Sequence, residues 1–380
     1  MEFSCDRKSL LAAARRTAKA AASTTTVDAL AGILLTADAE NYELTLSATD
    51  LNIAITCTVT APVVAGGSVV VGAKLFVEML SLLKGQTVEI KLHPQHQLAV
   101  TSDTAGYLVA CLPAEEFPSL NLPEQTETIE LSGVKGLAKQ TVFAAAKSGN
   151  LPMQCVKLEL SGDSLRAIGC DGAVLSASRR ELTGGKPVSL LIPAPSFSAL
   201  AGSVGEEEKL LFSTDGKQAV FYSPEQDMTF ATRLGSGTYL DADTVLSGVA
   251  KQYEALVDAS EFRSALDRTI TLSGTGSAYI NLVFSLGMIS LTCETEHGTA
   301  KDSLPAQVIT VMPPEGFCYQ GRKLLQGIQT MNGPIRIIVS AEGLLLISGG
   351  EQSFFQSPGK KPVAKTAKKK MTKKSATKAA

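Results

Sequence analysis

A few short patterns in this chain place reactive side chains at spacings that could support catalysis or metal binding. Ser132 and Lys135 fit the S-x-x-K spacing of a nucleophilic serine with a lysine base, and His93 and His96 could supply two metal ligands. No partner motif follows Lys135, and Ser132 comes just before a predicted helix, where an N-cap explains it better. Pro94 breaks any helix that would align the histidines, and no cysteine or acid completes a metal set.

Glycine-containing patterns fail for similar reasons. Residues 162–165 (Gly-Asp-Ser-Leu) resemble a hydrolase signature but lie in a predicted hairpin turn, and Gly274 and Gly276 form a lone G-x-G without the context of a phosphate loop. The chain has only three histidines and no converging acid–base set. We therefore expect no enzymatic activity, no metal and no cofactor.

The stronger functional signal comes from basic side chains in two predicted helices. The helix expected at 7–22 and its counterpart at 134–147 contain no acid, and their basic residues are Arg7, Lys8, Arg15, Arg16, Lys19, Lys135, Lys139 and Lys147. A solvated surface would explain one such helix, but two at corresponding positions favour a positive face that holds a phosphate backbone without reading bases. A third helix weakens this pattern, because Glu261 and Asp267 accompany Arg263 and Arg268.

The formal net charge of −2 conceals a strong asymmetry along the chain. Residues 358–380 hold nine lysines and no acid, which leaves 26 of the 35 basic residues against 37 acidic ones, a net charge of −11, in the rest. This lysine-rich segment cannot bury apolar surface and is expected to be disordered, where it would attract polyanions, nucleic acid first. A solubilising or partly artefactual tail is the alternative.

A threefold repeat must position the basic helices. Leu10, Gly136 and Phe262 follow corresponding strands at intervals of 126 residues. The clearest second helix of a repeat spans residues 74–83, with apolar residues at helical spacing and Gly85 as its expected stop. A strand that ends in a small residue and an acid also recurs, at Asp50, Asp171 and Glu294.

Each repeat reads as β-α-β-β-β-α-β-β-β, with hairpins best marked at 158–168, 210–221 and 335–347. This pattern predicts an α+β fold of three tandem domains, with helices on one face of antiparallel sheets. The predicted domains are residues 1–124, 125–250 and 251–357, followed by the lysine-rich segment 358–380.

The composition favours a soluble globular protein in a reducing compartment. The seven cysteines are scattered, their number is odd and none forms a C-x-x-C pair, which favours a cytoplasmic protein. No apolar run reaches the ~18 residues of a membrane span, and the N-terminus lacks a signal-peptide core. We therefore expect no membrane contact.

The three-part pattern, with basic helices on one face, resembles the bacterial DNA polymerase III beta subunit, the sliding clamp family. The resemblance rests on the N-terminal Met-x-Phe, the helix with Leu10 and Leu11, residues 48–51 (Ala-Thr-Asp-Leu) and residues 112–118 (Leu-Pro-Ala-Glu-Glu-Phe-Pro). In the second repeat, residues 170–172 (Cys-Asp-Gly) resemble the family's Thr-Asp-Gly segment. The resemblance covers residues 1 to about 355 and weakens toward the third repeat.

The resemblance implies a head-to-tail homodimer that closes a ring around duplex DNA. Electrostatic contacts that do not depend on sequence would let the ring slide and confer processivity on a replicative DNA polymerase. By position, Lys74 matches a DNA-contacting residue of the family, in addition to the basic residues of all three first helices. The family's dimer contact maps to Tyr107 and Val109 against Ile270 and Leu272, apolar side chains suited to an interface.

The family also has a hydrophobic pocket that binds short linear motifs of polymerases, clamp loaders and other partners. Its positions map to Met153, Cys170, Gly172, Ala173, Val174, Leu175, Leu240, Thr244 and Val245. This chain departs from the family at Ala173 and Val174, where His-Arg is common, and at Leu240, where proline is common. Residues 354–358 (Phe-Phe-Gln-Ser-Pro) and the lysine-rich segment also replace the segment that usually closes the pocket. These departures favour a changed partner specificity, as in a divergent paralogue or a phage-encoded version.

Two other functions stay open at this point. The chain could be an architectural DNA-binding protein anchored by its lysine-rich segment, with the body as a scaffold. It could also be a regulatory clamp-like protein that binds partners and never encircles DNA. Loss of DNA affinity on deletion of residues 358–380 would favour the first alternative, and failure to form a closed dimer would favour the second.

Overall fold

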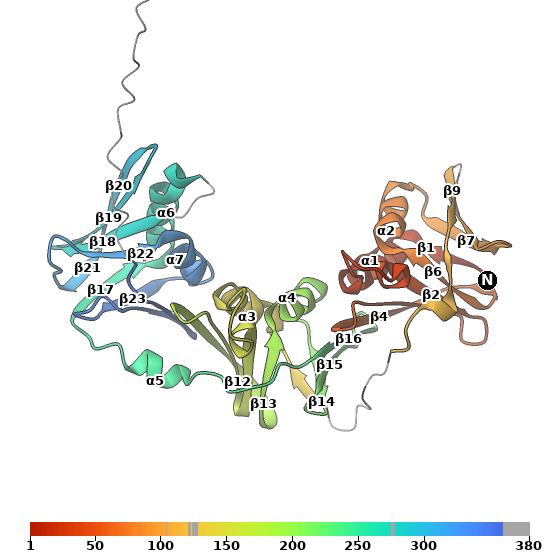
Figure 1. Cartoon of the computed structure of the whole chain (residues 1–380), viewed down its shortest axis with the longest axis horizontal. Coiled ribbons are helices and arrows are strands. Elements are labelled where there is room, and N and C mark those ends of the chain that lie inside the picture. The colour runs from red at the N-terminus through yellow and green to blue at the C-terminus, as the bar shows by residue number, and fades with distance from the viewer. Residues whose placement is uncertain (104, 121–122, 124–127, 275–277, 360–380) are drawn as a thin grey trace, which may run out of the picture.

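The computed structural model describes residues 1–103, 105–120, 123, 128–274 and 278–359. Figure 1 shows these residues as an arc of three groups of helices and strands, which follow one another in chain order. We refer to them as the first, second and third groups. Residues 360–380, predicted to be disordered, and the predicted boundary at residues 124–125 lie outside the described residues.

The first group contains helices α1 (Arg7–Thr17) and α2 (Ala73–Leu82). Its strands are β1 (Glu2–Asp6), β2 (Gly32–Asp38), β3 (Glu43–Thr49), β4 (Ile53–Thr60), β5 (Val63–Ala65), β6 (Gly67–Gly72), β7 (Thr87–His93), β8 (Gln97–Ser102), β9 (Ala105–Ala110) and β10 (Leu112–Pro113).

The second group contains helices α3 (Val134–Thr141) and α4 (Ala194–Ser203). Its strands are β11 (Ile129–Leu131), β12 (Cys155–Cys170), β13 (Val174–Pro193), β14 (Leu210–Thr214), β15 (Gln218–Ser223) and β16 (Met228–Arg233). A short helix, α5 (Ala242–Ser247), lies in the connection to the third group, on the convex side of the arc (Figure 1).

The third group contains helices α6 (Ala259–Ile270) and α7 (Gly321–Ile328). Its strands are β17 (Tyr253–Asp258), β18 (Tyr279–Ser285), β19 (Met288–Thr295), β20 (Gly298–Pro305), β21 (Gln307–Thr310), β22 (Phe317–Gln320), β23 (Pro334–Val339), β24 (Leu345–Gly349) and β25 (Gln352–Gln356). The expected α+β fold with helices and antiparallel sheets is confirmed.

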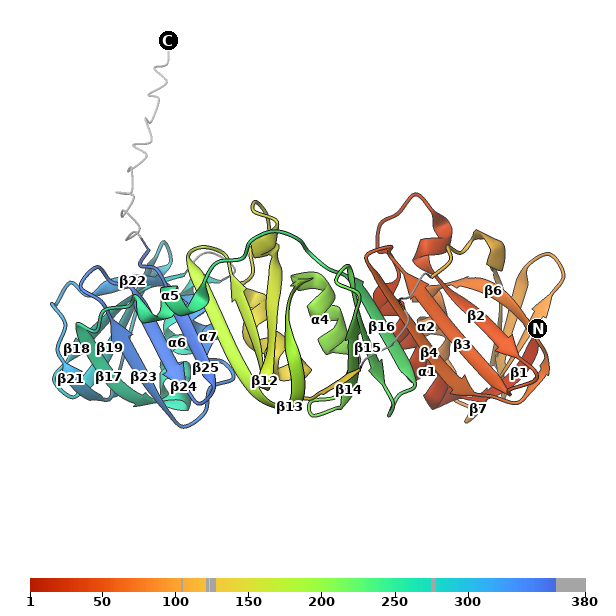
Figure 2. The ribbon, with the colours of Figure 1, turned by 90° about the horizontal axis from the view of Figure 1, so that it is seen from below.

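Two antiparallel sheets continue from one group into the next, as Figure 2 shows along the length of the arc. A nine-stranded sheet with the order β10-β6-β2-β3-β4-β16-β15-β14-β11 pairs β4 of the first group with β16 of the second. A seven-stranded sheet with the order β12-β13-β25-β24-β23-β17-β21 pairs β13 of the second group with β25 of the third. The two ends of the arc carry the sheets β5-β1-β7-β8-β9 and β20-β19-β18-β22.

The buried apolar side chains follow the same joins. One hydrophobic cluster runs through the first and second groups, and it includes Phe76 of α2 and Phe230 of β16. A second cluster fills the third group and takes in Ala144 and Val174 from the second group. The groups therefore share both backbone hydrogen bonds and core, which resists rotation of one group against the next.

The first helix of each group contains a threonine whose hydroxyl donates to the carbonyl four residues earlier. These bonds join Thr17 to Ala13 (2.9 Å), Thr141 to Leu137 (2.7 Å) and Thr269 to Ala265 (2.7 Å). The shared bond makes Leu10, Val134 and Phe262 equivalent, and all three are buried. The expected equivalence of Gly136 is therefore wrong by two residues.

The start of α3 explains that shift. Asp6 and Asp258 cap α1 and α6 by accepting hydrogen bonds from backbone N–H groups. The residue at the same point of α3 is Gly133, at φ +66°, and no side chain caps the helix there. The prediction of Ser132 as an N-cap is therefore wrong, and α3 lacks the first turn that α1 and α6 have.

Most of the expected hairpins have the predicted form. Strands β14 and β15 pair around Asp215, which accepts hydrogen bonds from two turn N–H groups, and β23 pairs with β24. At 158–168 both expected arms lie within β12, with Gly162 at φ +55° between them. The hydroxyls of Ser161 and Ser164 lie 3.1 Å apart and Arg166 lies 3.6 Å from Glu159, as expected for two arms that turn back on each other. Helix α2 ends at Leu82, short of the expected stop at Gly85, with Leu83 as its C-cap.

Phe354 of β25 tests the join between the second and third groups. Its side chain is fully buried, and its ring lies 6.2 Å from that of Phe143, which follows α3. We expect Phe354→Ala to lower the free energy of unfolding by about 3–5 kcal/mol, measured by urea denaturation, because it opens a cavity at this join. The control Tyr42→Ala removes a ring that is 59% exposed and should change the stability by about 0.5 kcal/mol or less. A loss as small as that of the control would contradict this account of the join.

Candidate nucleic-acid face and apolar junctions

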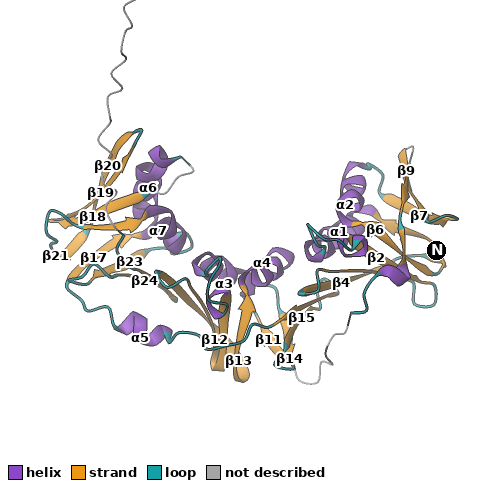
Figure 3. Cartoon of the chain, viewed as in Figure 1, coloured by secondary structure: helices purple, strands orange, loops and turns teal. Residues whose placement is uncertain are grey.

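Helices from all three groups lie on the concave side of the arc (Figure 3). The expected basic residues belong to these helices or to the turns that follow them. The sheets hold the helices from the convex side, so the repeated fold turns the first helix of each group toward the same concave space.

One cation in each first helix lies against the C-terminal end of the second helix of its group. Arg7 donates to the carbonyls of Gly85 (2.8 Å) and Leu80 (3.2 Å) at the end of α2. In the same way, Lys135 donates to Val204 after α4 (3.0 Å), and Arg263 donates to Met331 after α7 (2.7 Å). Cations satisfy the free carbonyls there and interact favourably with the helix dipole. These three predicted DNA contacts therefore have a structural role.

The basic side chains nearest the middle of the arc repel one another. Lys19 donates to the carbonyl of Gly202, which joins the end of α1 to α4 across the first and second groups. The pKa of Lys19 lies below its ordinary value, first because of partial burial and then because of the positive charges of Lys135 and Arg16. Like charges from two groups therefore share one region, and this region would be stabilised by a bound polyanion.

The remaining predicted DNA contacts differ in how they are held. Lys8, Lys74 and Lys147 are exposed, Arg16 is half-buried, and Arg15 donates to Ser81 (3.2 Å). Two others are paired with acids, since Lys139 contacts Glu206 and Arg268 donates to Asp302 (2.7 Å). Surface ion pairs of this kind are weak and can exchange an acid for a phosphate.

Part of the expected peptide pocket does come together, on the convex side where β13 meets β25. Cys170 and Leu175 belong to a small buried cluster with Phe355. Leu240 and Val245 pack against this cluster from the connection that contains α5. Burial raises the pKa of the Cys170 thiol, so Cys170 contributes a small neutral surface.

The other expected pocket residues lie apart from this cluster. Val174 is buried on the opposite face of β13, in the core of the third group. Gly172 and Ala173 are exposed at the turn between β12 and β13, Thr244 is exposed on α5, and Met153 is half-buried ahead of β12. Alternation along the strand explains the separation of Val174 from Leu175, since successive side chains point to opposite faces.

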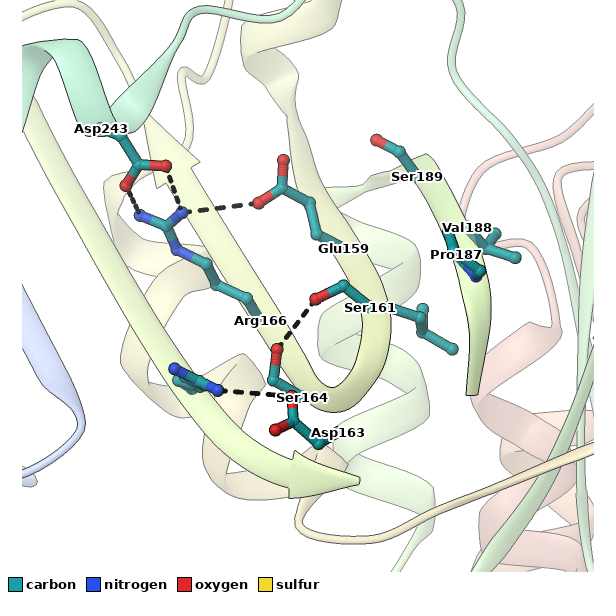
Figure 4. A pocket seen from close by; sticks show the side chains of 11 residues that line it. Glu159, Ser161, Asp163, Ser164, Arg166, Pro187, Val188, Ser189 and Asp243 are labelled. Carbon is teal, nitrogen blue, oxygen red and sulfur yellow. Dashed lines mark hydrogen bonds and ion pairs between the residues drawn. The ribbon is translucent and has the colours of Figure 1, made fainter. Parts of the chain in front are cut away.

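An ion pair fastens the connection to the second group, beside an open groove of about 730 Å³ (Figure 4). Arg166 of β12 donates to both carboxylate oxygens of Asp243 (2.7 and 3.0 Å), and its guanidinium lies 3.6 Å from Glu159. The hydrogen bond from Arg166 holds the pKa of Asp243 below its usual range. The groove's charges are thus largely paired within the protein.

Tyr239 holds the same connection at its start. Its hydroxyl lies 3.2 Å from the carbonyl of Ile168 and 3.4 Å from that of Cys155, and burial raises its pKa. Sequence reasoning missed Tyr239, Arg166 and Asp243. Asp241 followed by Thr244 was an available signal for α5, because Asp241 caps that helix and accepts from the Thr244 hydroxyl at 2.7 Å.

The four expected dimer-contact residues lie at opposite ends of the arc. Tyr107 and Val109 are half-buried on β9, which is the outer strand of its sheet. Ile270 is buried at the end of α6, and Leu272 is exposed in the turn that follows. Figure 1 places β9 at one end and α6 with β20 at the other, so these residues do not meet within one chain.

The described residues contain no group of three or more His, Cys, Asp or Glu side chains arranged to hold a metal ion. None of the helices that these residues form is long and apolar enough to cross a membrane.

Comparison with known proteins gives a consistent set of relatives. Residues 1–123 match the family described as the N-terminal domain of the DNA polymerase III beta subunit. The beta sliding clamp of Bacillus subtilis is 26% identical over 291 residues, which cover 73% of this chain and 75% of the relative. The beta sliding clamp of Synechococcus elongatus is 26% identical over 319 residues, 80% of this chain and 83% of the relative.

Solved structures share the fold over nearly the whole chain. A putative DNA polymerase III beta subunit from Eubacterium rectale has a TM-score of 0.85 at 19% identity, covering 94% of this chain and 99% of that one. The sliding clamp of Bacillus subtilis has a TM-score of 0.83 at 22% identity, with 95% and 100% covered. The Pseudomonas aeruginosa clamp bound to griselimycin has a TM-score of 0.83 at 19% identity, with 95% and 99% covered.

Two neighbouring residues of α1, Arg7 and Lys8, test the distinction between cations with a structural role and exposed cations. We expect Arg7→Met to lower the free energy of unfolding by about 1.5–3 kcal/mol, because two carbonyls at the end of α2 lose a charged donor. Lys8→Met removes an exposed charge and should leave stability within about 0.5 kcal/mol while reducing the salt dependence of duplex DNA binding. Thermal denaturation and salt titrations of DNA affinity measure the two effects. Equal stability losses in both variants would contradict the helix-end role of Arg7.

Proposed function

The chain belongs to the DNA polymerase III beta subunit family, and we propose that it is a sliding clamp that encircles duplex DNA and tethers a replicative DNA polymerase. In this proposal the protein is not a catalyst. Its ring holds DNA by topology, and partners gain processivity because they stay attached to the ring. The concave face would contact phosphates through Lys8, Arg15, Arg16 and Lys74, with weaker contributions from the cations that are paired with acids or with backbone carbonyls.

The observation that carries this proposal is that the strands at the two ends of the arc correspond to the strands that pair at its internal joins. At each internal join, the last strand of one group pairs with a strand of the group before it: β16 pairs with β4, and β25 pairs with β13. In the first group β9 corresponds to β16 and β25, in the third group β20 corresponds to β4 and β13, and both β9 and β20 lie at sheet edges. A second copy placed head to tail would supply each edge with its partner and close a ring.

The two internal joins also predict the register of that contact. At the first join the first residue of β16, Met228, faces the fifth residue of β4, Cys57. At the second join the first residue of β25, Gln352, faces the fifth residue of β13, Ser178. The same rule places Ala105 of one copy opposite Asp302 of the other. Counting along both strands then places Leu108 opposite Thr299.

Side chains on the inner face of the contact follow the same repeat. At the second internal join, Phe143 lies in the short turn after the first helix, against Phe354, the third residue of β25. Lys323, the third residue of α7, donates to the carbonyl of Phe143 at 2.5 Å. The contact between two copies would bring the corresponding residues together.

Those corresponding residues are apolar. They are Leu272 in the turn after α6, Tyr107 as the third residue of β9, and Leu75 as the third residue of α2. Leu272 and Leu75 are 37% and 47% exposed in the single chain, and burial of this surface would stabilise the dimer. The contact is thus proposed to include Tyr107, Val109 and Leu272, whereas Ile270 supports it from the core.

We further propose that partners bind as linear peptides at the cluster where β13 meets β25. The described surface there is built from Cys170, Leu175, Leu240 and Val245, with Gly172 and Ala173 at its edge. Leu240 and Val245 are half-buried and lie on the connection held by Arg166 and Tyr239, so small shifts of that connection would admit an apolar side chain. Val174 supports the fold behind this surface.

A pair of introduced cysteines tests the register of ring closure. Residues directly opposite in antiparallel strands have Cβ atoms about 4.5–5.5 Å apart, near the separation that a disulfide needs. We expect Leu108→Cys/Thr299→Cys to form an intermolecular disulfide under mild oxidation, seen on a non-reducing gel. The matched control Leu108→Cys/Lys301→Cys moves one cysteine two residues along the same face and should cross-link much less. Equal cross-linking of the two variants would contradict the register.

The same cross-linked variant tests encirclement. Oxidised in the presence of circular duplex DNA, it should stay on the circle through a wash at about 1 M salt, where electrostatic contacts are screened. Cutting the circle should release it, as measured by gel filtration of the DNA–protein complex. Release from the intact circle would contradict encirclement and favour a regulatory role without it.

Deletion of residues 358–380 in this variant distinguishes the remaining alternative. The ring should still be retained on circular DNA, because retention does not depend on the lysine-rich segment. Loss of nearly all affinity on deletion would favour the architectural DNA-binding protein anchored by that segment.

A further inference from the structure

The first internal join contains a hollow of about 200 Å³ where β4 meets β16. The segment Pro118–Leu120, which leaves the first group, lines one side of it. At the second join the connection that contains α5 runs over the corresponding place, above the cluster of Leu175 and Phe355. The hollow therefore occupies, in the first join, the position at which the peptide surface is proposed in the second.

The side chains in register explain why space exists at the first join. Leu175, the second residue of β13, faces Phe355, the fourth residue of β25. At the first join the same two positions are Ala54 of β4 and Ala231 of β16, which also face each other. Two alanines replace a leucine and a phenylalanine on the same backbone arrangement. The missing side-chain volume is what leaves the hollow open.

The turn beside the hollow carries an unusual residue. Leu51 has φ +73° and its side chain is 51% exposed at the edge of the hollow. The same position of the second join is Gly172, at φ +93°. A left-handed backbone conformation is unfavourable for leucine and not for glycine. Because the Leu51 side chain is exposed, packing in the core does not offset this loss of stability. Strained backbone of this kind clusters at ligand-binding sites and switch regions.

Charge and size narrow the class of ligand. Among the residues that line the hollow, Arg233 is the charged one, and it is exposed at the end of β16. Asn52 on the turn adds a polar group beside it. Sites for drug-sized ligands span about 300–1,000 Å³, so this hollow admits one or two side chains. An apolar anchor with an adjacent carboxylate fits both properties.

We propose that the first join is a second binding site for linear peptides. A bound peptide would insert an aliphatic or aromatic side chain between Ala54 and Ala231 and place an acidic group on Arg233. The proposal rests on the peptide-binding role proposed for the second join, to which the repeat relates it. Each chain would then present two peptide sites of different shape, and the first would select acidic motifs.

Peptide stoichiometry tests this proposal in the full chain. The probe is a fluorescein-labelled peptide, Ser-Leu-Asp-Leu-Phe, whose leucine and phenylalanine supply the anchor and whose aspartate supplies the charge. We expect isothermal titration calorimetry to find two peptides per chain. The variant Ala54→Leu/Ala231→Phe fills the hollow with the pair that the second join already packs in the same register, so it should fold and bind one peptide.

A variant at the second join is the matched control. Leu240→Asp/Val245→Asp should remove the other site and leave one peptide bound per chain, the one at the first join. If the filled variant binds as many peptides as the parent, or if the second-join variant binds none, the second site is refuted. Ring closure is measured separately by cross-linking, so that failure would leave the clamp proposal standing.

Two single substitutions test the named side chains. Arg233→Glu should weaken the site at the first join about tenfold, because it replaces the proposed partner of the aspartate with a like charge. Leu51→Gly copies the second join and should weaken that site while leaving the melting temperature unchanged or raised, since the left-handed strain is relieved. A Leu51→Gly variant that loses stability and keeps full peptide affinity would overturn the role assigned to the turn.

Discussion

The pairing of strands across groups is the constraint on which the rest of the structure depends. Hydrogen bonds between β4 and β16, and between β13 and β25, make continuous sheets out of groups that are far apart in the sequence. Their registers orient the groups, and the orientation turns the helices to one side of the arc. The same pairing leaves β9 and β20 at the ends. An exposed strand edge invites pairing, so the internal joins themselves specify the contact that a second copy would make.

The basic residues serve two purposes that their sequence does not separate. Arg7, Lys135 and Arg263 close the C-terminal ends of the second helices, and Lys19 joins the first group to the second. These bonds place positive charge on the concave side and make it part of the fold. A polyanion bound there would meet a preformed positive electrostatic potential. Flexible cations such as Lys8 could add contacts without a rearrangement of the fold.

Differences between the joins arise from side-chain volume on a common backbone. Leu175 and Phe355 fill the second join beneath a connection held by Arg166 and Tyr239, whereas Ala54 and Ala231 leave the first join hollow. A repeated fold can therefore diversify its binding surfaces without changing its strand pairing. The strained Leu51, where the second join has Gly172, is a further difference of the same kind.

The sequence by itself determined the threefold repeat, the α+β class, most hairpins and the position of the basic helices, because periodicity and turn residues act locally. It also placed Cys170, Leu175, Leu240 and Val245 near one another through the family resemblance. Only the tertiary structure decided that Val174 faces the core, that Arg7 caps another helix and that α3 begins at Gly133. Those facts depend on which strand lies beside which and on how much volume its neighbours occupy. Local sequence patterns do not specify the contacts between residues that are distant in the chain.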